Sequence, residues 1–287
     1  MTAAPPVRVR SRHVQWVEDR LSARDWAIIE TVNRLGLVSG VQLERCHFAD
    51  LAEGRSRTVS RSRTLARLVA WRVLLPLPRR VGGPRQGSSV TVFALDTAGV
   101  RLLRQRTGMD NAGRIRRPGI PGERFVRHVL AVAELYTGLV EAARSGNFIL
   151  RQFQAEPRWP DGLGGSVNPD AYVVVSNGRV DHLWWIEVDM ATESLPTVRR
   201  KLRTYLDFLA RGGHGPRGVM PRVLVAVPDQ HRAAAVRAEV SPCRRPPPTL
   251  CTLSVKASWR RGWCKNSLHS RTGLFGGSND SQMNQTA

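Results

Sequence analysis

The sequence predicts a mixed α/β fold of the α+β type, built from two consecutive regions. Apolar residues recur at helical spacing between residues 21 and 70, and a strand, a glycine-rich turn and a second strand follow them. Residues from about 123 to 240 combine long helical segments with short apolar runs that are typical of strands. The formal net charge is +21, with 44 Lys and Arg residues against 23 Asp and Glu residues. A field of that sign favours polyanionic partners, of which nucleic acid is the most common.

Three helices are expected in the first region. The first begins after Ser22, a good N-cap residue, and ends at Gly36. A second, shorter helix begins after Ser39, and a third covers about residues 58–70. The apolar residues at helical spacing include Trp26, Ile29, Val32, Leu35, Leu65, Leu68 and Val69. Residues 1–20 are polar and are expected to form a flexible N-terminus.

A β-hairpin is expected after the third helix. Residues 73–77 and 90–95 have the apolar character of strands, and the glycine-rich segment 79–87 between them is typical of a turn. Three helices followed by a hairpin with a basic tip is the element order of a winged helix-turn-helix. We place this domain, with one further short helix, at residues 21–106. Residues 107–122 are rich in Gly, Pro and Arg and are interpreted as a linker.

The second region, residues 123–240, is expected to form a mixed α/β domain. Its expected helices are 122–145, 195–210 and 230–239, and its expected strands are 148–154, 171–175, 182–188 and 222–227. Ser194 can cap the second of these helices, and Pro196 lies in its first turn, where proline is tolerated. After residue 240 the apolar periodicity ends, so residues 241–287 are interpreted as a disordered or aberrant tail. A shifted reading frame is an alternative explanation for the abrupt change in residue usage.

The arginines of the third helix and of the hairpin predict a binding surface for double-stranded DNA. The candidate residues are Arg57, Arg61, Arg63, Arg67, Arg79, Arg80 and Arg85. Arg57 and Arg61, like Arg63 and Arg67, are four residues apart and therefore neighbours on the helix surface, which we expect to lie off the buried face. About six phosphate contacts would give log K against log salt a slope near −5. The alternative is a solvated charged face in an arginine-biased protein.

Acidic residues at strand ends predict a metal site in the second region. Asp170 begins one strand, while Glu187 and Asp189 end the next. Because side chains alternate across a strand, Glu187 and Asp189 face the same side, where Asp170 can join them. Converging carboxylates are the ligands that Mg²⁺ or Mn²⁺ prefers, and such an ion can activate water against a phosphodiester. Asp170 and Glu187 are therefore candidate metal ligands, and all three acids are candidate catalytic residues.

An acid followed by an acid–x–lysine strand is the pattern of restriction-endonuclease-like nucleases. This chain departs from it, because Asp189 occupies the lysine position. Lys201, the only lysine between residues 1 and 240, lies on the following helix and is the candidate to supply the missing positive charge. Glu134, on the helix before the strands, is a further candidate acid. The alternative is a structural role, in which the acids pair with nearby arginines.

Several segments carry a family resemblance over about residues 20–240. They are LVAWRVLLPLPRRVGG, FALDTAGVRLL, the helix with His128 and Glu134, Pro169-Asp170, and WWIEVDMATESLPTVRRKLRTYLDFL. The chain resembles the replication-relaxation proteins of actinobacterial plasmids and mobile elements. The resemblance implies a role in plasmid replication and DNA relaxation, and a second domain similar to restriction-endonuclease-like folds. The family's usual continuation past the fourth strand is not recognisable, so a truncated second domain is expected.

Two functions are consistent with these features. One is a DNA-binding protein of a plasmid or mobile element that acts in replication or DNA relaxation as a metal-dependent nuclease or nickase. The other is a winged-helix transcriptional regulator whose non-catalytic second domain forms a homodimer or binds a partner.

The composition argues against several other classes of protein. No run of about 18 apolar residues is present, so no membrane span is expected. The N-terminal residues lack the apolar core of a signal peptide, and a cytoplasmic location is expected. The 4 cysteines form no CxxC pair, which argues against a zinc site.

Overall fold

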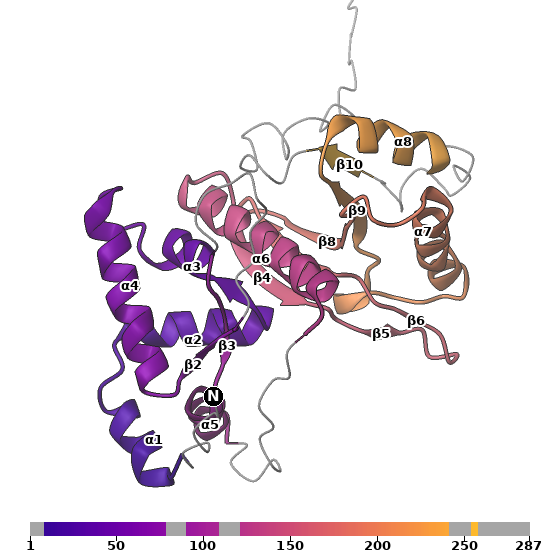
Figure 1. Cartoon of the computed structure of the whole chain (residues 1–287). Coiled ribbons are helices and arrows are strands. Elements are labelled where there is room, and N and C mark those ends of the chain that lie inside the picture. The colour runs from indigo at the N-terminus through magenta and orange to yellow at the C-terminus, as the bar shows by residue number, and fades with distance from the viewer. Residues whose placement is uncertain (1–8, 79–89, 109–120, 241–253, 258–287) are drawn as a thin grey trace, which may run out of the picture.

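The computed structural model describes residues 9–78, 90–108, 121–240 and 254–257. Within these ranges the chain has the mixed α/β architecture expected from the sequence, with a three-stranded, a five-stranded and a two-stranded sheet. Figure 1 shows the helices of the first region on one side of the molecule and the five-stranded sheet on the other. The long helix α6 (Glu123–Arg144) lies between them.

Apart from the short strand β1, the elements of the first region follow the order that the sequence predicts. Its elements are α2 (Ala23–Leu35), β1 (Val38–Ser39), α3 (Gly40–His47), α4 (Arg55–Ala70), β2 (Leu74–Pro76), β3 (Val92–Leu95) and α5 (Thr97–Arg106). Ser22 and Ser39 cap α2 and α3 through reciprocal capping boxes. The strands pair antiparallel in the order β1-β3-β2. β1 escaped prediction because two residues carry no periodicity.

The N-terminus expected to be flexible contains a helix, α1 (Ser11–Glu18). Val14 and Val17 are fully buried in the core of the first region, and α1 packs against α5. Two valines and an exposed tryptophan, Trp16, in an otherwise polar segment gave too weak a pattern for the helix to be predicted. Most of the expected linker, 109–120, and the turn of the hairpin, 79–89, lie outside the described residues.

The second region is built on the five-stranded sheet, whose strands lie in the order β10-β9-β8-β7-β4. Its elements after α6 are β4 (Ile149–Ala155), β5 (Trp159–Pro160), β6 (Ser166–Val167), β7 (Ala171–Ser176), β8 (Asp181–Val188), α7 (Leu195–Ala210), the 3₁₀ turn η1 (Pro216–Gly218), β9 (Arg222–Val227), α8 (Gln230–Val240) and β10 (Ser254–Ala257). Strands β4, β7 and β8 are antiparallel, whereas β8, β9 and β10 are parallel. Ser194 caps α7 as predicted.

Strand β10 comes from the segment that the sequence assigns to a tail. Its four residues pair in parallel with β9, with Ser254 opposite Leu224 and Ala257 opposite Val227. A strand this short, after a proline-rich stretch, has too little apolar pattern to be predicted. In the described residues the sheet therefore extends one strand beyond β9.

Side-chain alternation divides the second region into two packed faces. Val173 and Ile186 lie in the same core cluster as α6, whereas Tyr172 and Trp185 lie in the cluster that α7 and α8 cover. Because side chains alternate along a strand, Glu187 falls on the α7 side, next to the buried Trp185. The sheet thus presents the acidic end of β8 to α7.

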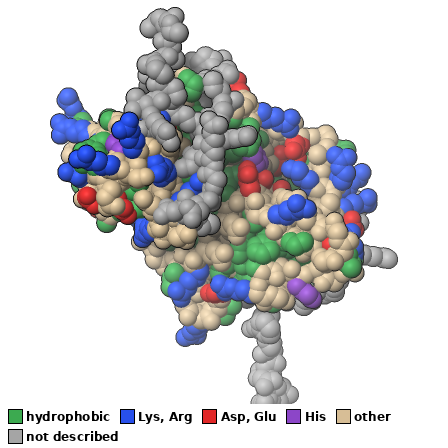
Figure 2. Space-filling model, turned by 90° about the horizontal axis from the view of Figure 1, so that it is seen from below, with side chains coloured by type: hydrophobic (Ala, Val, Ile, Leu, Met, Phe, Trp, Pro, Cys, Tyr) green, Lys and Arg blue, Asp and Glu red, His purple; other side chains and the backbone are tan. Residues whose placement is uncertain are grey.

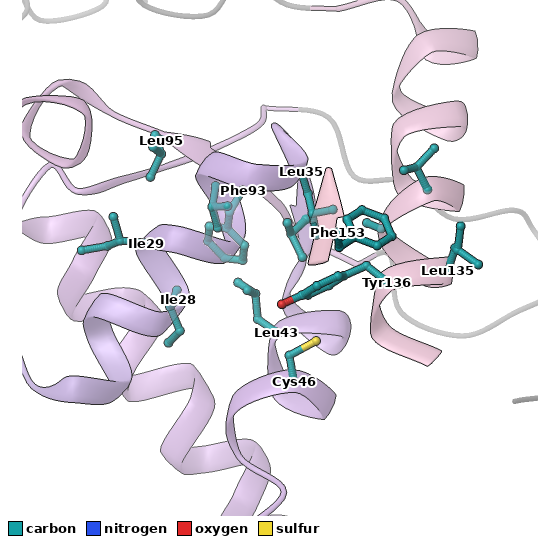
Figure 3. Packing of buried hydrophobic residues seen from close by; sticks show 14 of the residues in the cluster. Ile28, Ile29, Leu35, Leu43, Cys46, Phe93, Leu95, Leu135, Tyr136 and Phe153 are labelled. Atoms are coloured by element: carbon teal, nitrogen blue, oxygen red, sulfur yellow. The ribbon is translucent and has the colours of Figure 1, made fainter. Parts of the chain in front are cut away.

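One hydrophobic core runs through both regions, which the sequence treats as separate domains. It joins Leu43 of α3, Leu135 and Tyr136 of α6, and Phe153 of β4. In Figure 3 the Tyr136 and Phe153 rings lie together, facing residues of the first region. Their centroids are 5.0 Å apart in an edge-on arrangement. The apolar stripe of α6 is therefore shared by the two regions.

Polar contacts from α3 to α6 reinforce this packing. Arg45 donates to Glu141 at 2.8 and 2.6 Å and to Glu134 at 2.5 Å. Gln42 donates to the Leu130 carbonyl at 3.0 Å and to Glu134 at 3.1 Å. The sequence suggested Glu134 as a further acid of the metal site. Its carboxylate instead accepts hydrogen bonds from Gln42 and Arg45 of the first region.

Candidate functional site

The four predicted DNA-binding arginines of α4 have different surroundings. Arg57 donates to the Leu51 carbonyl, with Nε at 2.9 Å, and Arg61 pairs with Glu44 at 2.9 Å. Their side chains are 14% and 20% exposed. Both precede the buried Leu65 at intervals of four residues, so they lie on the inner side of the helix. The expectation that they lie off the buried face was wrong: they anchor α4 to the rest of the region.

Arg67 is also tied to the fold. Its guanidinium donates to both carboxylate oxygens of Asp25, at 2.6 and 2.7 Å, and lies 5.0 Å from the centre of the Trp71 ring. Asp25 is fully buried at the N-terminus of α2. Arg67 therefore compensates a buried charge and links α4 to α2.

Arg63 belongs to a different, outward-facing set. We define the outer face of α4 as the residues that line a surface depression of about 490 Å³: Arg55, Ser56, Val59, Ser60, Arg63 and Thr64. Their positions repeat every three to four residues along one side of the helix. In the described part of the chain, Arg55 and Arg63 make no ion pair or side-chain hydrogen bond. Arg55 was missed by the sequence analysis because the helix begins three residues earlier than predicted.

The residues of the outer face include two arginines and no acidic side chain. Helix α4 contains no acidic residue, and no side chain caps its N-terminus at Gly54. The N–H groups of its first turn therefore add a partial positive charge to the arginines. Figure 1 places α4 at the outer edge of the molecule, away from the five-stranded sheet. The hairpin arginines Arg79, Arg80 and Arg85 lie outside the described residues.

A second group of candidate functional side chains gathers where β7 and β8 meet α6 and α7. Asp170 accepts a hydrogen bond from the Val188 N–H at 2.6 Å, and its other oxygen lies 3.0 Å from His128 Nε2. The hydrogen bond to Asp170 raises the pKa of His128, against the effect of its burial. His128 was noted only as part of the family resemblance, and its contact with the acid could not be predicted from spacing. Figure 2 shows acidic side chains close to a histidine on one face of the molecule.

Glu187 and Lys201 lie together in this group. The Lys201 ammonium is 3.8 Å from Glu187 and 3.2 Å from Glu193. Tyr205, one turn further along α7, donates its hydroxyl proton to Glu187. Burial, followed by the charge of Asp170, raises the pKa of Glu187 to about 7. The lysine of α7 thus lies beside the acid, and its role as the substitute for the missing strand lysine stays a prediction.

Burial and the nearby charge of Glu187 also raise the pKa of Tyr205. The residue is 2% exposed, so its hydroxyl is a protonated donor to Glu187 and is not accessible as a nucleophile. The pKa of Lys201 is raised as well, because Glu187 and Glu193 outweigh its partial burial. Lys201 therefore carries its positive charge at neutral pH.

Asp189 is on the same side of the sheet but has another partner. Its carboxylate accepts from Arg232 of α8 at 2.6 Å and from the Ala191 N–H at 2.8 Å. Arg232 also donates to the Glu193 carbonyl at 2.7 Å. The structure therefore brings Asp170, Glu187 and Lys201 together and holds Asp189 in a separate ion pair.

This group offers two carboxylates as ligands for a hard divalent cation. In the ranges that the structure describes, no three or more His, Cys, Asp or Glu residues are arranged to hold a metal ion. Asp170 and Glu187 supply oxygen atoms of the kind that Mg²⁺ prefers, and water or a phosphate would complete the coordination. Burial, followed by the charge of Asp170, disfavours the ionised form of Glu187, and the charge of a bound cation would offset both effects.

The fold and these two groups define a basic α/β protein that combines an arginine-bearing helix face with a largely buried pair of carboxylates and a half-exposed lysine. A family model described as replication-relaxation matches residues 29–223, and the chain belongs to this family. The matched segment includes α4, Asp170, Glu187 and Lys201. No curated protein and no solved structure matches the chain. Among the described helices, none has the length and apolar character needed to cross a membrane.

Proposed function

We propose that this chain binds double-stranded DNA through the outer face of α4, used as the recognition helix of a winged helix-turn-helix, and acts in the replication or relaxation of plasmid or mobile-element DNA. The observation that carries the proposal is the division of the arginines on α4. Arg57, Arg61 and Arg67 are bound to the fold, whereas Arg55 and Arg63 face outward beside Ser56 and Ser60. The family membership supports a role in DNA metabolism.

The outer face has the properties that duplex DNA requires. An α-helix fits the major groove of B-DNA, which is roughly 12 Å wide. Arginine forks and serine hydroxyls donate to phosphate oxygens or to base edges. The anchored arginines hold α4 in place, so that Arg55 and Arg63 are presented from a fixed helix.

The test is duplex affinity measured by fluorescence anisotropy at about 150 mM salt. Replacing Arg55 and Arg63 together by Ala should weaken binding at least about tenfold, because charge-assisted contacts are lost. The matched control is Arg158→Ala with Arg179→Ala, which removes the same charge from two exposed positions of the second region. Equal weakening by both pairs would contradict binding through α4.

A second candidate function, metal-dependent cleavage of a phosphodiester, is favoured by the position of Lys201 beside Glu187. Asp170 and Glu187 would hold Mg²⁺ or Mn²⁺, which supplies an activated water molecule when bound. Lys201 would place a positive charge next to the phosphate, and the Val188 N–H and His128 would orient Asp170. This cluster would make the protein a nuclease or nickase.

Nicking of supercoiled plasmid with Mg²⁺ or Mn²⁺ tests this second function. Asp170→Asn and Lys201→Ala should abolish nicking while leaving duplex affinity unchanged, since neither residue lies on α4. Binding without metal-dependent nicking by the unmodified protein would instead favour the regulator, in which the second region only dimerises or binds a partner.

A further inference from the structure

Val59 is an unusual residue in its surroundings. It lies between Arg55 and Arg63 on the outer face of α4 and is 38% exposed. The apolar residues that hold α4 on the core, Leu65 and Leu68, are 4% and 0% exposed on the opposite side. Val59 therefore contributes little to the packing of the helix and presents its methyl groups to the surrounding depression.

The neighbours of Val59 leave room for an approaching base pair. Ser56, Ser60 and Thr64 are short, whereas Arg55 and Arg63 are long and lie one turn to either side of Val59. The outer face therefore has short side chains at its centre and an arginine at each end. Phosphate oxygens are bound by donors such as the arginines and serines of this face, whereas the exposed valine at its centre offers no donor. Apolar contact with the C5-methyl group of thymine, in contrast, is a recognised form of base readout in the major groove.

We propose that the outer face of α4 reads DNA sequence, with Val59 contacting the methyl group of a thymine while Arg55 and Arg63 hold the adjoining phosphates. The inference rests on the proposed DNA binding. It names the class of DNA that would be bound, which is duplex sites that contain thymine at a fixed position. Charge complementarity selects DNA as the occupant, because α4 contains no acidic residue.

The experiment begins with selection of bound duplexes from a random library by the full chain. Each thymine of the selected site is then replaced by deoxyuridine, which lacks only the methyl group. One replacement should weaken binding by about fourfold, the effect of losing one buried methyl contact. In Val59→Ala that replacement should have no effect, whereas the control Val180→Ala, at an exposed valine of the β7–β8 turn, should behave as the unmodified chain does.

The outcomes separate the two proposals. Salt-sensitive duplex binding without sequence enrichment would overturn the role of Val59 and leave DNA binding intact. Enrichment in which the deoxyuridine effect persists in Val59→Ala would also overturn it. Absence of duplex binding under any condition would overturn the proposed function together with this inference. Because Val59 is exposed, Val59→Ala should fold normally, which circular dichroism checks.

Discussion

Arg63 and Arg67 stand four residues apart on α4, yet their environments differ. Arg67 neutralises the buried Asp25, whereas Arg63 faces outward. Without Arg67, the bonds that the buried carboxylate keeps among the described residues are those to Ser22. Arg67→Ala should therefore cost about 2 kcal/mol of unfolding free energy, whereas Arg63→Ala should change it by less than about 0.5 kcal/mol. Urea denaturation followed by circular dichroism measures both, and equal losses would contradict the assigned roles.

His47 gives the fold a dependence on pH. Burial, followed by the charges of Arg144, Arg24 and Arg34, lowers the pKa of His47 to about 4. In the unfolded chain the group titrates near 6.5, so the unfolded state binds more protons between these values and stability falls as the pH falls through that window. Between pH 7 and pH 5 the loss should be about 2 kcal/mol.

The variant His47→Gln isolates this contribution, since an amide can keep the bond to Thr31 that His47 makes at 3.0 Å. Thermal unfolding at pH 7 and pH 5 should show a smaller fall in Tm for the variant than for the unmodified chain. The same fall in both proteins would mean that other groups cause the acid sensitivity.

The sequence could predict part of the candidate sites at this scale. Arg57, Arg61 and Leu65 follow one another at intervals of four residues, which places the two arginines on the inner side of α4. Their charge, in contrast, suggested an exposed position off the buried face. Lys201 was found because it is the only lysine in its part of the chain. The contacts of Asp189 with Arg232 and of Asp170 with His128 join residues more than forty positions apart, so no local pattern could predict them.

At the scale of elements, Gly99 sets how closely α5 approaches β2. A Cβ atom at this position would lie 2.5 Å from the Val73 carbonyl oxygen, which belongs to the backbone and cannot move aside cheaply. Gly99→Ala should therefore destabilise the protein by about 2 kcal/mol, although alanine is the better helix former by about 1 kcal/mol. The control is Gly122→Ala, whose Cβ would meet nothing within 4 Å. Chemical denaturation compares the two, and a stabilised Gly99→Ala would contradict the close packing.

The helices α2, α3, α6 and α7 were predictable because each combines a cap or a long apolar stripe with a clear end. Capping by Ser22, Ser39 and Ser194 occurs as expected. The elements that were missed, α1, β1, β5, β6, η1 and β10, are two to eight residues long. Elements this short are stabilised by their packing partners and not by their own pattern.

At the scale of the whole molecule, α6 makes the two regions depend on each other. Its stripe packs on both, and Arg45 fixes it to α3 through Glu134 and Glu141. The sequence suggested two domains joined by a linker. The apolar stripe of α6 predicts that this helix is buried, but it does not identify the residues that pack against it. The shared core instead predicts a single cooperative unfolding transition.

Calorimetry tests this prediction. The calorimetric and van't Hoff enthalpies of unfolding should agree, as they do for a two-state protein. Two separated transitions would contradict a shared core. A fragment ending at residue 108 should unfold at a lower temperature than the full chain, because Leu43 and Cys46 would lose the cover of α6.

The central claim, that the outer face of α4 carries the affinity for duplex DNA, is tested most directly by the salt dependence of binding. Each lost phosphate contact reduces the slope of log K against log salt by about one. Relative to the unmodified chain, Arg55→Ala with Arg63→Ala should therefore give a slope shallower by about two, whereas Arg158→Ala with Arg179→Ala should leave it unchanged. An unchanged slope for the α4 pair would contradict the claim.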